Sequence, residues 1–343
     1  MTGKNRSGIL AGGNWLVDYT KIIDAFPAQD TLVNILGETS NNGGGPYNVL
    51  IDLARLQAPF PLAAVGLVGD DAAGEYIRRD CQSHQIDTRQ LHITKEAPTS
   101  YTDVMTVKST GRRTFFHQRG ANALLDQTHF DFAQSDARIF HLGYLLLLDR
   151  LDQPDPACGT VAASVLKRAQ ESGFKTSVDL VSVESDRFAE IVLPALRHCD
   201  FCILNEFEAE RVTGIKINKD GKIDLSAARA AASELARAGL REWTVLHFPA
   251  GAIAAGVNGE VFVQASVNMP QSFVAGTTGA GDAFAAGVLF GLHESVPMER
   301  ALTYGVCAAA ASLTNPTSSN GVVPLAECLA LADRFGYRSL SYD

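Results

Sequence analysis

The chain has 343 residues, of which 46% are hydrophobic and 20% charged, so it can bury a large core and is not disordered. Its net charge of −9 argues against nucleic acid or an anionic membrane as partner. No apolar run is long enough to span a membrane, and the N-terminus lacks a signal-peptide pattern. Six scattered cysteines, with a CxxC spacing only at Cys199 and Cys202, favour core thiols in a reducing, cytoplasmic setting over a metal site.

The N-terminal segment predicts a strand over residues 8–16, and Asp18 follows it. Ligands of open α/β sheets gather at the carboxyl ends of strands, so Asp18 is well placed to bind one. A plain cap or turn residue is the alternative. Residues 20–39 show no helical pattern, which indicates an excursion from the main sheet.

A glycine cluster, Asn41-Asn-Gly-Gly-Gly-Pro-Tyr-Asn48, precedes a helical apolar pattern that continues to Leu56. Glycines at this place allow close approach of the backbone to a ligand, and Pro46 suits an early helical position. An ordinary loop with a helix cap is the alternative. The next strand and turn, Leu62 to Asp71, lead into a helix predicted over 72–84.

Residues 99–118 alternate with a period of two and are interrupted by Ser109-Thr-Gly-Arg112, which predicts a hairpin. Together with the earlier excursion, it predicts a small antiparallel lid formed by about 18–40 and 98–120. A lid that closes over an active site excludes water.

A regular alternation of strands and helices follows and predicts a parallel sheet with helices on both faces. We expect one domain spanning 1–343, with Asn258-Gly259 at the turn of a late hairpin. The strands fit 138–142, 176–180, 200–204 and 243–247, and the helices fit 160–172, 187–197, 225–238 and a long one from Met298.

The motif Asn205-Glu-Phe-Glu208 ends one of these strands and opens a helix. An amide and a carboxylate three residues apart can hold a hydrated Mg²⁺ through water, because Mg²⁺ keeps several of its waters. Acidic residues are also common in a first helical turn for dipole reasons alone, so a capped helix is the alternative.

The segment Gly276-Thr-Thr-Gly-Ala-Gly-Asp282 is a glycine-rich turn that leads into an apolar helix. Unpaired N–H groups at Gly279, Ala280 and Gly281, with the helix dipole behind them, predict an anion site. Asp282 would then act as a base that activates a substrate hydroxyl toward a phosphate held by those N–H groups. A merely capped helix is the alternative.

These segments together resemble the ribokinase-like (PfkB-type) carbohydrate and nucleoside kinases. GTTGAGDAFAAG at 276–287 is similar to the C-terminal signature of that family, and Gly43, Gly44 and Asn48 match its sugar-binding signature. The resemblance extends from about Ile9 to Phe335. It implies an α/β, three-layer sandwich with a central, mostly parallel sheet and a small antiparallel β lid, through which two chains pair as a homodimer.

The implied activity is ATP-dependent phosphorylation of a sugar hydroxyl, with ATP and Mg²⁺ required. The resemblance assigns catalysis to Asp282 with Gly279, Ala280 and Gly281, and substrate binding to Asp18, Gly43, Gly44, Asn48 and Arg119. It assigns the nucleotide to Asn205, Glu208, His247, Gly251, Thr277, Thr278, Asn315 and Gly321, with Asn205 and Glu208 also serving Mg²⁺.

Three positions depart from the family pattern. Gly276 replaces an aspartate that contributes to a monovalent-cation site in many relatives, which leaves K⁺ activation open. The segment from His247 to Gly251 is a shortened nucleotide motif with Pro249 in place of a glycine, so the choice of phosphoryl donor is also open. Gly143 stands where ribose-specific relatives carry a glutamate, and ribose is therefore not the leading substrate.

Two other functions fit the same residues. A ribonucleoside kinase would need aromatic side chains that stack on a base, for which Trp15, Tyr47, Phe115 and Phe116 are candidates. A ligand-binding protein with little catalysis would explain the altered nucleotide and cation segments, but the intact Asp282 argues against it.

Overall fold

The central sheet of the computed structural model, which describes residues 6–340, has nine strands in the order β17-β16-β15-β12-β11-β8-β1-β4-β5. Its neighbours are parallel except at β15–β16 and β16–β17, which pair antiparallel. The strands are β1 (Ile9–Gly13), β4 (Leu62–Gly69), β5 (Asp87–Thr94), β8 (Ile139–Leu145), β11 (Lys175–Leu180), β12 (Phe201–Asn205), β15 (Trp243–Phe248), β16 (Gly251–Gly256) and β17 (Val261–Ala265).

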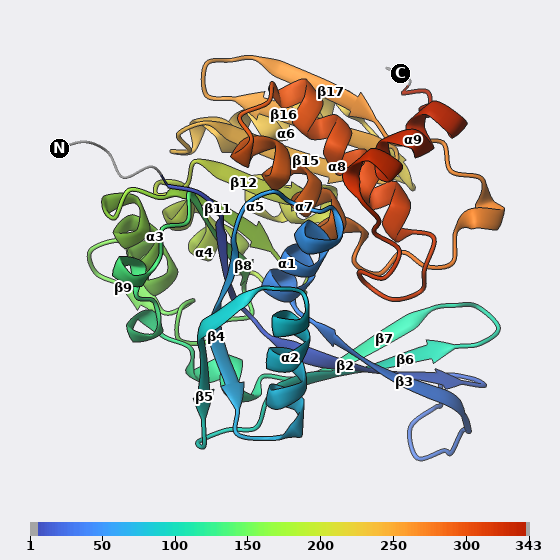
Figure 1. Ribbon diagram of the computed structural model, residues 1–343. Coiled ribbons are helices and arrows are strands. Elements are labelled where there is room, and N and C mark those ends of the chain that lie inside the picture. The colour runs from blue at the N-terminus through green and yellow to red at the C-terminus, as the bar shows by residue number, and fades with distance from the viewer. Residues whose placement is uncertain (1–5, 341–343) are drawn as a thin grey trace.

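Helices cover both faces of this sheet (Figure 1). The apolar run of β1, which is buried along its whole length, is typical of a strand with both faces covered. One core includes residues of α1 (Gly45–Arg55), α2 (Ala72–Ser83), α7 (Ala280–His293), α8 (Met298–Ser312) and α9 (Leu325–Phe335). The core on the other face includes residues of α3 (Val161–Glu171), α4 (Phe188–Leu196), α5 (Glu206–Thr213) and α6 (Leu225–Arg237).

The predicted three-layer α/β architecture is thus confirmed, as are the helices and strands of the alternating region. The starts of the helices α2, α3 and α6 are fixed locally by side-chain caps. The carboxylates of Asp71 and Asp224 and the hydroxyl of Thr160 each accept a hydrogen bond from the N–H three residues on. Strand β5 was not predicted.

The strand order reverses around β1, which lies between β4 and β8. At its carboxyl end Gly13 is in register with Gly66 on one side and Gly143 on the other. A β-carbon on Gly13, whose φ is 131°, would collide with the Gly143 carbonyl oxygen. Open α/β sheets bind ligands at such a reversal.

A second, four-stranded sheet projects from the main body in the order β3-β2-β6-β7 (Figure 1). It consists of β2 (Leu16–Ile23), β3 (Ile35–Gly43), β6 (Ser100–Val107) and β7 (Arg113–Gln118). The β2–β3 and β6–β7 pairs are antiparallel, and the β2–β6 pair that joins them is parallel. Two minor hairpins are β9 (Pro154–Asp155) with β10 (Gly159–Thr160) and β13 (Asn218–Lys219) with β14 (Lys222–Ile223).

The N-terminal strand differs from the prediction. The run 8–16 is broken after Gly13, where the backbone N–H of Asn14 donates to the Gly143 carbonyl and the chain leaves the main sheet. Asp18 therefore lies within β2 of the small sheet and does not follow a main-sheet strand. Residues 41–43, predicted as part of a loop, complete β3 and deliver the chain directly into α1. Along residues 6–340, no helix has the length and apolar character needed to cross a membrane.

Candidate active site

The glycine-rich turn and the first turn of α7 form the centre of the site. Gly279 caps the helix with φ of 76°, and any β-carbon there would collide with the backbone of Ser318. Gly276 is equally confined, because a β-carbon there would lie 2.8 Å from the Cα of Pro316. The close packing holds the N–H groups of Ala280 and Gly281 at the start of the helix, where they could stabilise an anion, although the Ala280 N–H also makes a long hydrogen bond of 3.4 Å to the Thr277 carbonyl.

Asp282 is buried in this first turn, and both of its carboxylate oxygens accept hydrogen bonds. The Tyr144 hydroxyl donates to Oδ1, and the Asn48 amide donates to Oδ2 at 2.8 Å. Burial raises the pKa of Asp282 to about 6, and the two hydrogen bonds limit the rise. A carboxylate with this pKa is ionised at neutral pH and can accept a proton.

Asn14, which follows β1, links that strand to the end of β8 and the start of α1 beside this carboxylate. Its Oδ1 accepts hydrogen bonds from the N–H of Tyr144 at 2.9 Å and of Gly45 at 3.3 Å. Within residues 6–340, its buried Nδ2 has no partner, and neither has the buried Oδ1 of Asn48. Buried polar atoms are nearly always hydrogen-bonded, so these two atoms are suited to a polar ligand.

Asp18 approaches the same place from the small sheet. A β-carbon on Gly43 would lie 2.5 Å from its Oδ2, so only glycine allows the two strands to present Asp18 here. Burial raises the pKa of Asp18 to about 6; a hydrogen bond from Thr102 lowers it, the Asp282 charge raises it, and Arg113 lowers it. The structure thus brings together Asn14, Asp18, Gly43, Asn48 and Asp282, which we call the acceptor side of the candidate site.

A second acidic cluster lies at the carboxyl ends of β11 and β12. Asn205 and Glu208 form a reciprocal capping box at the start of α5, and the Ser182 hydroxyl donates to Glu208 at 2.8 Å. Burial raises the pKa of Glu208 to about 7. The pKa of Asp179 is also raised, first by burial and then by the charges of Glu208 and Asp282.

Within residues 6–340, no three His, Cys, Asp or Glu side chains come together as a metal-binding group, so this cluster could serve a divalent cation only through water. The groups that perturb Asp179 are carboxylates and a backbone donor, so its negative charge lacks compensation from a neighbouring base. Oxygen ligands of this kind suit Mg²⁺, and Asn205, whose Oδ1 already caps the helix, would reach the ion through water.

A pocket of about 770 Å³, large enough for a nucleotide, opens beside the glycine-rich turn. Six of the predicted nucleotide and anion residues line it, namely Asn205, His247, Gly251, Thr277, Ala280 and Gly281. Asn315 and Gly321 do not line it: Gly321 packs under the end of α8, where a β-carbon would lie 2.6 Å from the Ala311 carbonyl oxygen. The wall expected from them is formed by Ala309, Ala310 and Leu313.

A second pocket of about 600 Å³ lies between the small sheet and the turn. Its lining includes Asp18, Arg113 and Phe115 from the small sheet and Thr277 and Thr278 from the turn. Thr277 lines both pockets, which places the acceptor and nucleotide sides next to each other at the turn.

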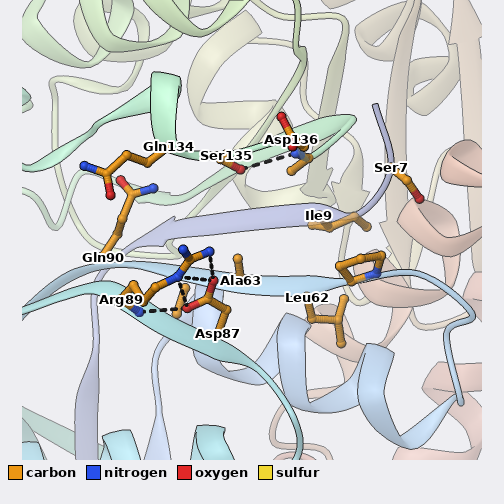
Figure 2. A pocket seen from close by; sticks show the side chains of 13 residues that line it. Ser7, Ile9, Leu62, Ala63, Asp87, Arg89, Gln90, Gln134, Ser135 and Asp136 are labelled. Atoms are coloured by element: carbon orange, nitrogen blue, oxygen red, sulfur yellow. Dashed lines mark hydrogen bonds and ion pairs between the residues drawn. The ribbon is translucent and has the colours of Figure 1, made fainter. Parts of the chain in front are cut away.

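Another hollow, of about 200 Å³, lies at the opposite ends of the strands (Figure 2). Its arginine, Arg89, is bound by the neighbouring Asp87 carboxylate at 2.6 Å, as the dashed lines in Figure 2 show. It adjoins none of the residues around Asp282, so it is not part of the candidate site.

Arg119 is the predicted substrate residue that is not brought to Asp282. Its guanidinium lies 3.3 Å from Asp149 and donates to the Leu146 carbonyl. Sequence reasoning missed Asn14, Arg113, Tyr144 and Asp179. Asp179 ends a predicted strand, so the carboxyl-end rule could have identified it. Arg113 lies in an alternating hairpin, and the sequence around it gave no indication of a functional role.

The sequence matches the model of the pfkB family carbohydrate kinases over residues 14–324. An ATP-dependent ribose-1-phosphate kinase of Halopiger xanaduensis is 25% identical over 95% of this chain and 99% of its own length. A fructokinase of Klebsiella pneumoniae is 30% identical over 73% of this chain and 76% of its own. The solved structure of Arabidopsis thaliana ribokinase with ribose and ATP superposes with a TM-score of 0.79 at 20% identity, covering 95% of this chain and 98% of that one.

The chain therefore belongs to the pfkB family of carbohydrate kinases. It is an ATP-dependent phosphotransferase, a sugar or nucleoside kinase.

Proposed function

We propose that this kinase phosphorylates a hydroxyl group of a neutral sugar, with Asp282 as the general base. The observation that carries the proposal is the position of the Asp282 carboxylate, which lies in the anion-binding turn and is hydrogen-bonded by Asn48 of the acceptor side. The acceptor hydroxyl gives its proton to Asp282 while its oxygen bonds to the γ-phosphorus of ATP. The bond from that phosphorus to the bridging oxygen breaks, and its electron pair leaves with ADP.

The residues of the turn and of the acidic cluster support this transfer. The N–H groups of Gly279, Ala280 and Gly281 stabilise charge on the phosphoryl oxygens as it passes. Asn205 and Glu208, together with Asp179, would hold Mg²⁺ through water, and the ion would supply positive charge to the ATP phosphates. His247, Gly251 and Thr277 contact the nucleotide in the first pocket, and Thr278 lines the adjoining second pocket.

The aromatic side chains favour a sugar over a nucleoside. Trp15 and Tyr47 are 0% and 7% exposed and pack on each other in the core, so neither is available to stack on a base. Of the pair Phe115 and Phe116, Phe115 alone lines the pocket. A single exposed phenylalanine offers one face to a base, whereas Asp18, Asn14 and Asn48 offer the polar groups that sugar hydroxyls need.

We also propose that the small sheet, formed within 18–40 and 98–120, acts as a lid on the one domain spanning 1–343. Its apolar side chains Leu32, Ile35 and Leu36 are 87%, 55% and 51% exposed, and they would be covered if two chains paired through their lids. Light scattering of the wild type against Ile35→Glu tests the homodimer: the variant should be a monomer. We place the enzyme in the cytoplasm, where ATP is available and the six unbridged cysteines stay reduced; cell fractionation tests this.

The experiment that tests the proposed function is ADP release from ATP and Mg²⁺ across pentoses, hexoses, keto-sugar acids and ribonucleosides. We expect turnover with a neutral sugar, and mass spectrometry should find one added phosphoryl group on it. Turnover confined to ribonucleosides or to sugar acids would contradict the proposal.

A further inference from the structure

We propose that Arg113, at the start of β7 in the small sheet, is a further catalytic residue that contacts the phosphoryl group during its transfer. The inference rests on the proposed function of the same site. Arg113 is exposed on the hairpin, yet its guanidinium reaches across the second pocket to the glycine-rich turn. It donates to the Thr278 hydroxyl and, at 3.4 Å, to the Thr277 hydroxyl.

The position of these two threonines decides which anion Arg113 meets. They immediately precede Gly279, the cap of α7, so a group that contacts them lies beside the N–H groups that receive the phosphoryl oxygens. Thr277 also lines the nucleotide pocket. Arg113 thus stands at the junction of the two pockets, where the γ-phosphoryl passes from ATP to the acceptor.

The charges of the site favour a cation at this junction. Asp18 lines the second pocket together with Arg113, and the two side chains interact electrostatically. The Asp282 charge acts on both Asp18 and Asp179, so an incoming phosphoryl group approaches several carboxylates. Two arginines line the pockets, Arg113 and Arg338, and the backbone of Arg338 pairs with Ser266 on the nucleotide side. Arg113 is the one that touches the turn.

The chemistry of a guanidinium suits this role. It stays protonated throughout the reaction and offers parallel N–H donors that match two phosphoryl oxygens. Arg113 neither takes nor gives a proton; the acceptor proton still goes to Asp282 and the electron pair still leaves with ADP. Because the residue belongs to the small sheet, its contact with the turn also links closure of that sheet to the chemical step.

The test compares Arg113→Ala with Arg112→Ala, a neighbouring arginine of the same hairpin that does not line the pocket. We expect Arg113→Ala to lower kcat at least about 100-fold, the loss that follows removal of one donor to the developing charge, while Arg112→Ala keeps wild-type turnover. Arg113→Lys should give an intermediate kcat because it keeps the charge and loses the paired donors. Circular dichroism should show all three variants folded, since both side chains are exposed.

Binding measurements separate this inference from the proposed function, because they need no acceptor. In the presence of Mg²⁺, the wild type should bind the ATP analogue AMP-PNP more tightly than ADP. Arg113→Ala should remove that difference in affinity without weakening the binding of ADP. A kcat within about threefold of wild type, or equal weakening of ADP and AMP-PNP, would overturn the role of Arg113. Absence of turnover in the wild type with every acceptor would instead count against the proposed function.

Discussion

The Tyr144 hydroxyl donates a hydrogen bond to the Asp282 carboxylate, which joins the end of β8 to the first turn of α7. This bond stabilises the ionised form of Asp282 and lowers its pKa against the effect of burial. Tyr144 therefore keeps the base available at neutral pH and fixes its direction.

Replacing Tyr144 by phenylalanine should raise the pKa of the base. Removing one donor to a buried carboxylate costs about 1.4 kcal/mol or more, so the acid limb of the rate profile should move up by about one pH unit. The measurement is kcat/KM as a function of pH for both enzymes. An acid limb that stays in place would mean that Tyr144 does not tune Asp282.

The wild-type enzyme should lose activity in acid. Asp282 must be ionised to take a proton, and its pKa is raised to about 6, as is that of Asp18. Lowering the pH through 6 protonates these carboxylates, so kcat/KM should fall at least tenfold per pH unit below about 6. A rate that stays constant down to about pH 4.5 would contradict the raised pKa of the base.

Asp52 on α1 should destabilise the fold at neutral pH. It is 0% exposed, and neither carboxylate oxygen makes a hydrogen bond of good geometry within residues 6–340, although the nearby Ser319 hydroxyl and the Arg55 charge lower its pKa. Its pKa is raised well above the ordinary value, first by burial and then by the Asp282 charge. The folded state therefore holds the proton more tightly than the unfolded state, and stability is highest in acid and falls as pH rises above the ordinary carboxyl pKa.

Asp52→Asn should remove that pH dependence. We expect it to raise the free energy of unfolding by about 1–3 kcal/mol at pH 8, with a smaller gain at pH 5, as measured by urea denaturation. If the variant were instead less stable at both pH values, the Asp52 charge would have a stabilising partner.

Asn205 should affect both the stability of α5 and the response to Mg²⁺. Asn205→Ala removes a helix cap, which costs about 1 kcal/mol, and should raise the Mg²⁺ concentration for half-maximal rate about tenfold. The matched control is Asp224→Ala, which removes the cap of α6 away from the site. Equal Mg²⁺ dependence in the two variants would leave Asn205 with a structural role alone.

The sequence predicted the regular part of the fold well, because local patterns determine it. The buried runs of the parallel strands were predicted without the structure, whereas the caps at Asp71, Thr160 and Asp224 were identified from it. The break after Gly13 was not predicted. It depends on the distant Gly143 carbonyl, with which a side chain at Gly13 would collide, and no local pattern records that contact.

The site, too, has a part that the sequence predicted and a part that it did not. The glycine-rich turn and Asn205-Glu208 are contiguous motifs, and the nearby sequence indicated what they could do. Tyr144, Asp179 and Arg113 come from separate strands and meet Asp282, Glu208 and Thr278 only through the sheet order. Arg119 was assigned by its place in a motif, but its guanidinium is directed to Asp149.

The measurement that tests the central claim most directly is the turnover of Asp282→Asn with the sugar that the wild type uses best. Asparagine keeps the shape of the side chain, and its Oδ1 can accept from the Asn48 amide while its Nδ2 donates to a rotated Tyr144 hydroxyl, but it cannot take the proton. The account predicts a kcat at least about 100-fold below wild type, with AMP-PNP binding retained. A variant that keeps near-full turnover would contradict the assignment of Asp282 as the base.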